Sequence, residues 1–62
     1  MSDIQKIYAS NGYEVWAKYD KSAELYELFT DKDGVGYVGC SDTLEEADVI
    51  AKDWVQEQMS TR

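Results

Sequence analysis

The sequence predicts an α+β fold in which a three-stranded antiparallel meander is packed by one C-terminal amphipathic helix. Two observations lead to this prediction. Apolar and polar residues alternate through the aromatic-rich first two thirds of the chain, whereas the last third repeats its apolar residues at helical spacing. The 62 residues suffice for one thin core, so we expect a single domain with an N-terminal segment (1–11), a β-meander (12–40) and a helix (43–59).

Three segments have the pattern of strands. Residues 12–19 and 25–30 alternate between two faces, and the second segment carries large apolar groups on both, as a central strand does. Residues 35–40 are rich in β-forming residues and glycines, which indicates a bulge or a close backbone approach. The runs 20–22 and 31–34 between them are typical of turns, which completes a meander.

The last third has the signals of a helix. Thr43 is a good N-cap, and Glu46 three residues later completes a capping box. Asp48 and Lys52 can pair one helical turn apart. The apolar residues fall on one stripe that should cover one face of the sheet: Leu44, Ala47, Ile50, Ala51, Trp54 and Val55.

The N-terminal segment fits two structures. Ile4, Ile7 and Tyr8 match a helical turn and a half. The pair Asn11-Gly12 is instead a strong hairpin signal, which would make the segment an extra strand beside residues 13–19. Because alternation before Asn11 is poor, we favour a short helix or irregular structure here.

The composition excludes several classes of function. Without histidine, the usual near-neutral acid or base and the commonest zinc ligand are both missing. The single Cys40 cannot form an internal disulfide and has no base beside it, so we expect no enzyme and no cofactor. The apolar runs are too short for a membrane span or a signal peptide, so we expect a cytoplasmic protein.

The acidic excess has two interpretations. Six basic residues against 13 acidic ones give a net charge of −7, which argues against direct binding of nucleic acid or an anionic membrane. The carboxylates either form a solubilising surface or imitate the phosphates of a nucleic acid. A row of this kind could include Asp31, Asp33 and Asp42 near strand ends, with Glu45, Glu46, Asp53 and Glu57 on the helix.

Residues 31–42 resemble the calcium loop of EF-hand proteins, with 23–29 as the entering helix. Two departures stand out: Val35 occupies the place of an oxygen ligand, and the closing position holds aspartate in place of the bidentate glutamate. The metal ligands that this resemblance implies are Asp31, Asp33, Tyr37 (through its carbonyl) and Asp42. The alternative is an Asp-rich hairpin turn.

Aromatic residues should also lie on the face of the sheet that one helix leaves uncovered. Trp16 and Tyr26 are the main candidates, because tryptophan and tyrosine are enriched at binding hot spots. An aromatic face with an acidic rim suits a protein partner better than nucleic acid, since the rim repels phosphate.

As a type, the chain resembles the small acidic proteins that bacteriophages and plasmids encode against host enzymes, such as anti-CRISPR proteins, antirestriction DNA mimics and phage RNA polymerase inhibitors. The resemblance rests on size, net charge, the aromatic segments 13–19 and 25–30, and the opening of an acidic helix at 42–47. It implies a non-enzymatic protein of the host cytoplasm. Such a protein binds a host protein or complex with a basic nucleic-acid-binding surface and blocks it. A homodimer is compatible with this sequence.

In this hypothesis the electrostatic contacts are Glu45, Glu46, Asp53 and Glu57, and the apolar anchors are Trp16 and Tyr26. Two alternatives stay open from the residues. One is the EF-hand-like, calcium-responsive module. The other is a small structural or regulatory subunit with the same fold.

Overall fold

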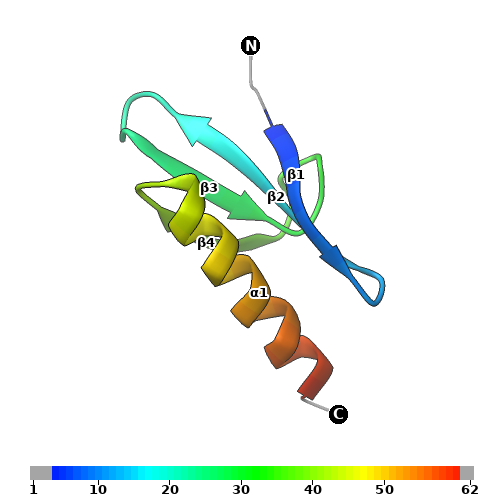
Figure 1. Cartoon of the computed structure of the whole chain (residues 1–62). Coiled ribbons are helices and arrows are strands. Elements are labelled where there is room, and N and C mark those ends of the chain that lie inside the picture. The colour runs from blue at the N-terminus through cyan, green and yellow to red at the C-terminus, as the bar shows by residue number, and fades with distance from the viewer. Residues whose placement is uncertain (1–3, 61–62) are drawn as a thin grey trace.

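In the computed structural model, which describes residues 4–60, one helix covers one face of a four-stranded antiparallel sheet (Figure 1). The α+β prediction is therefore confirmed, with one strand more than expected. The strands lie in chain order: β1 (Ile4–Ser10), β2 (Tyr13–Asp20), β3 (Leu25–Phe29) and β4 (Tyr37–Ser41). Helix α1 (Leu44–Ser60) then runs back across the sheet.

The N-terminal segment is a strand, so our preference for helix or irregular structure is wrong there. Asn11 and Gly12 both have positive φ (51° and 85°), as the two-residue hairpin turn between β1 and β2 requires. The β1–β2 register shifts between Lys6 and Tyr8. Because of this bulge, the consecutive residues Ile7 and Tyr8 both pack against the core, which breaks the alternation in the sequence.

The β2–β3 and β3–β4 connections are held by aspartate side chains. Asp20 Oδ1 accepts a hydrogen bond from the Ser22 N–H (3.0 Å), and Asp31 Oδ1 accepts one from the Val35 N–H (2.9 Å). Aspartate favours turns because its carboxylate can bond to backbone N–H groups a few residues along. Both turn-forming runs are thus loops of the meander.

Thr43 caps the N-terminus of helix α1, as the sequence predicts. The Glu46 N–H donates to Thr43 Oγ1 (3.1 Å), and the Ala47 N–H donates to the Thr43 carbonyl (3.0 Å). The first bond satisfies one of the N–H groups that a helix start leaves without partners, and the second is the first hydrogen bond within the helix. The predicted ion pair also forms, with 3.1 Å between Lys52 Nζ and Asp48 Oδ2. The helix lies within one residue of the expected 43–59 at each end. It is the one helix in the described part of the chain, and it is not long and apolar enough to cross a membrane.

The core lies between the inner face of the sheet and α1. Two small residues, Ala47 and Ala51, are fully buried on the helix and let its backbone approach the strands closely. At the far end Tyr13 and Trp54 pack edge to face, with ring centroids 6.0 Å apart. The buried apolar residues are Val15, Ala17, Leu28, Ala47, Ala51 and Val55.

We expect Gly36→Ala to destabilise the fold by about 1–3 kcal/mol, because the new Cβ would fall on the Thr30 hydroxyl. The Thr30 N–H also donates to the Gly36 carbonyl (2.8 Å), which holds the two residues opposite each other. In a double-mutant cycle measured by urea unfolding, Thr30→Ala should recover much of the loss. Additive effects would show that another contact is responsible.

Candidate functional site

Glu46, Asp53 and Glu57 share one side of α1. Their spacings of seven and four residues place them in line along the helix, about 16 Å from first to last at 1.5 Å per residue. We call these three residues the acidic stripe. Glu45 lies outside it, since one residue turns a helix by about 100°. Three of the four predicted electrostatic contacts therefore come together, and the fourth points elsewhere.

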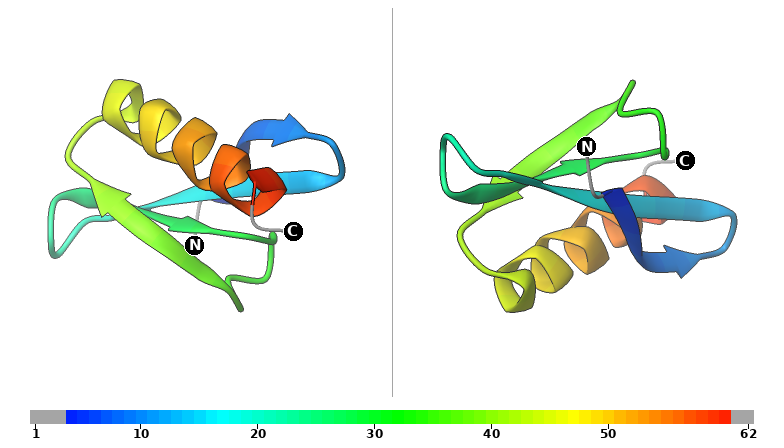
Figure 2. Two further views of the ribbon diagram at one scale, coloured as in Figure 1. Left: turned by 90° about the horizontal axis from the view of Figure 1, so that it is seen from below. Right: turned by 90° about the horizontal axis from the view of Figure 1, so that it is seen from above.

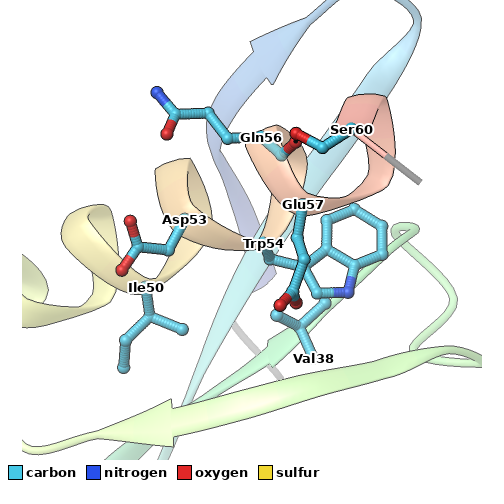
Figure 3. A pocket seen from close by; sticks show the side chains of 7 residues that line it. All are labelled: Val38, Ile50, Asp53, Trp54, Gln56, Glu57 and Ser60. Atoms are coloured by element: carbon cyan, nitrogen blue, oxygen red, sulfur yellow. Dashed lines mark hydrogen bonds between the residues drawn. The ribbon is translucent and has the colours of Figure 1, made fainter.

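A groove of about 520 Å³ lies between α1 and β4, beside the acidic stripe. Figure 3 shows Ile50 directed from the helix toward the strand and Val38 directed from the strand toward the helix. A Cβ built on Gly39 would lie 3.7 Å from Ile50 Cγ2, so the helix crosses close above this glycine. The residues that line the α1–β4 groove are Val38, Ile50, Asp53, Trp54, Gln56, Glu57 and Ser60.

Trp54 is the large aromatic of this groove, and sequence reasoning assigned it only to the core. It is half-buried, so part of its indole packs on the core while part lines the groove. The available signal was its helical position, because Ile50 and Trp54 are the members of the apolar stripe nearest to Asp53 and Glu57. With Asp53 and Glu57 it combines an apolar surface with two carboxylates, a combination suited to a partner side chain that is both apolar and basic.

Trp16 lies on the opposite side of the molecule. Its partner across the β2–β3 pair is Phe29, and both side chains are on the face that α1 does not cover, the open face. The Trp16 Nε1–H donates to Glu14 Oε1 (3.1 Å), and Lys6 Nζ stands 5.7 Å from the indole centroid. Lys6 Nζ is also 3.7 Å from Glu14 Oε2, so neighbours already cover part of this ring.

Tyr26 lies on the face that α1 covers. It is half-buried against the core, and its ring centroid is 5.0 Å from that of Tyr19 on the neighbouring strand. The two predicted apolar anchors, Trp16 and Tyr26, are therefore on opposite faces of one sheet. One flat partner surface cannot contact both.

The open face carries further aromatics that the sequence did not single out as a group. Phe29 and Tyr37 are paired across β3 and β4, with ring centroids 5.9 Å apart. Hydrogen bonding to the Cys40 side chain, some loss of hydration, and the charges of Cys40 and Glu27 raise the pKa of Tyr37 above its usual 10.0.

The charges are divided between the two sides of the molecule. Helix α1 carries five carboxylates and one lysine, and that lysine is paired with Asp48. By contrast, Lys6 and Lys18 project from the strands beside Trp16, and Lys32 lies with Lys18 and Phe29 around a hollow on the open face. The helix side is acidic, and the open face is mixed in charge.

The segment expected to be the entering helix of a calcium loop is strand β3, so that part of the EF-hand prediction is wrong. The alternation of residues, with large apolar side chains on both faces, predicts this strand correctly, whereas the helical spacing does not. The reason is that β3 is an inner strand with neighbours on both sides. The Asp31 carboxylate is used to close the loop through the Val35 N–H. Within residues 4–60 no three His, Cys, Asp or Glu side chains are grouped as metal ligands would be.

Comparisons with known proteins add no relative. No family model, no curated protein and no solved structure matches this chain.

Proposed function

We propose that this protein is a non-enzymatic binding module whose acidic helix occupies the nucleic-acid site of a host enzyme and so inhibits it. The observation that carries the proposal is the acidic stripe beside the α1–β4 groove. Carboxylates in line along a rigid helix resemble a row of phosphates, and an apolar groove next to them adds contacts that phosphates lack.

The charge density of the acidic stripe indicates how many phosphates it can imitate. The stripe holds three carboxylates over about 16 Å, so neighbouring carboxylates are on average about 8 Å apart along the helix. Duplex DNA carries roughly one charge per 1.7 Å of axis, and one strand carries one per about 3.4 Å. The stripe can therefore replace a few phosphates of one strand. The remaining affinity must come from apolar burial in the groove.

Electrostatic attraction between the acidic helix and a basic partner supports the same proposal. Among the described residues, neither ion pair involves Glu46 or Asp53, so both carboxylates contribute their full charge to the surface. A basic channel in a nuclease or polymerase attracts such a surface, and attraction of this kind raises association rates and makes them sensitive to salt.

The test is a charge reversal at Glu46, Asp53 and Glu57, each to lysine. Tagged wild-type protein is used to capture partners from bacterial lysate, and the captured enzyme is then purified. We expect the reversed variant to associate with that enzyme at least tenfold more slowly and with a weaker salt dependence. Both are measured by surface plasmon resonance at several salt concentrations. A short nucleic-acid substrate of the enzyme should compete with the wild-type protein.

A matched control reverses three carboxylates elsewhere: Glu24, Glu27 and Asp33. Its net charge changes by the same amount, so equal losses in both variants would show that net charge matters and the stripe does not. Unchanged kinetics in the stripe variant, or binding that nucleic acid does not displace, would refute the proposal.

A further inference from the structure

Strand β4 has an unpaired edge. The sheet order is β1-β2-β3-β4, so β4 pairs with β3 alone. The Thr30 N–H donates to the Gly36 carbonyl, and hydrogen-bonded positions alternate along an antiparallel pair. Leu28 and Tyr26, which lie two and four residues before Thr30, therefore also form backbone hydrogen bonds with β4. Glu27, which lies between them, does not. Cys40, opposite Glu27, consequently directs its own N–H and C=O to the free edge.

The α1–β4 groove lies beside this free edge. Figure 2 shows α1 returning past β4 in the direction opposite to the strand, and Figure 1 shows the helix diverging from β4 toward its C-terminal end. The groove is lined by Val38 from the strand and by Ile50 and Trp54 from the helix. A chain that paired with β4 would place every second side chain on the side of the sheet where this groove lies.

The carboxylates beside the groove have the spacing of an extended chain. Asp53 and Glu57 are four residues apart, about 6 Å along the helix. Alternate side chains of a strand are about 6.6 Å apart. Two basic residues at positions i and i+2 of an extended segment would therefore meet these two carboxylates in turn.

The other free edge of the sheet lacks these features. β1 carries Lys6 and a bulge at its centre, both of which oppose the addition of another strand. β4 also has a register shift, but its sequence from Tyr37 to Ser41 contains no charged residue. A strand is therefore expected to add at β4.

We propose that a basic, extended segment of the partner adds to β4 as a fifth strand, with lysine or arginine side chains that reach Asp53 and Glu57 and pack their aliphatic stems in the α1–β4 groove. Backbone hydrogen bonds to β4 provide part of the affinity, and the groove selects the side chains. This inference deepens the proposed function and rests on it, since it states which part of a basic partner the acidic side of the helix binds.

The test uses a synthetic probe. It is an acetylated and amidated nine-residue peptide of alternating lysine and valine, titrated into the full chain and followed by NMR. We expect slowed hydrogen exchange of the Cys40 N–H and unchanged exchange along β1. The same peptide with glutamate in place of lysine should bind at least tenfold more weakly.

Two variants locate the binding site. Cys40→Pro removes one N–H from the free edge and should weaken the peptide about tenfold, whereas Cys40→Ala should bind like the wild type. Proline is tolerated where a strand N–H faces solvent, and circular dichroism checks that the variant folds. Asp53→Lys with Glu57→Lys should reverse the preference and favour the glutamate peptide.

The inference is overturned by absence of binding at millimolar peptide, by protection of β1 in place of β4, or by equal affinity of the two peptides. The exchange measurement on the wild-type protein decides the question even where Cys40→Pro does not fold. Because the probe is a peptide and not the captured enzyme, these outcomes are independent of the capture experiment. Binding of the peptide without capture of a nucleic-acid enzyme would refute the proposed function and leave the docking mode in place.

Discussion

Val55→Asp is expected to unfold the protein at neutral pH. Val55 is fully buried between α1 and the sheet, among apolar side chains. An unpaired carboxylate there costs several kcal/mol. A 62-residue domain has a total stability of roughly 3–9 kcal/mol, so this single change consumes most of it. Circular dichroism and one-dimensional NMR at pH 7 measure the outcome.

The matched control is Val49→Asp on the same helix, where the valine is 57% exposed and the carboxylate keeps its water. This variant should remain folded. The two variants should also differ in their response to acid. Burial raises the pKa of the carboxyl at position 55 in the folded state above its unfolded value, so the folded state binds the proton more tightly. Relative to the control, Val55→Asp should therefore gain stability as the pH falls through that raised pKa. Equal stability of the two variants at pH 7 would contradict the packing described here.

Leu28→Ala is expected to lower the free energy of unfolding by about 2–5 kcal/mol. Leu28 is fully buried on the inner strand β3, and its side chain is the largest of those that are. Its removal leaves a cavity, and because the core is one thin layer of side chains, few neighbours can move to fill it. Urea unfolding followed by tryptophan fluorescence measures the change.

Leu44→Ala makes the same chemical change at the start of α1, where the leucine is 41% exposed. It should cost less than about 1 kcal/mol. Similar losses in both leucine variants would mean that the helix, and not the core, limits stability.

The helix was predictable because its signals are local. The cap at Thr43, the apolar stripe and the Asp48–Lys52 pair depend only on residues within one or two turns of each other. Strand β1 was not predictable in this way, because the bulge beside Ile7 hides the two-residue period in the sequence. The turn at Asn11-Gly12 gave the correct signal, since its chemistry is also local.

The candidate site was predictable only in part. Spacing on one helix brings Glu46, Asp53 and Glu57 together, and spacing can be read from a sequence. Whether Trp16 and Tyr26 share a face depends on how their strands pair, and alternation within one strand does not determine that register. The groove at Val38 depends on where α1 crosses the sheet, which is a property of packing.

The strand order has a consequence for how the chain folds. Each strand pairs with the one before it, and closing such short loops costs little entropy, so most of the sheet can assemble from nearby residues. Helix α1 supplies the distant contacts: the Asn11 side-chain amide meets Met59 Sδ at 2.7 Å across 48 positions of the chain. We therefore expect docking of the helix to be the late, cooperative step of folding. When the helix detaches, the β1–β2 hairpin should be the first part of the sheet to become exposed.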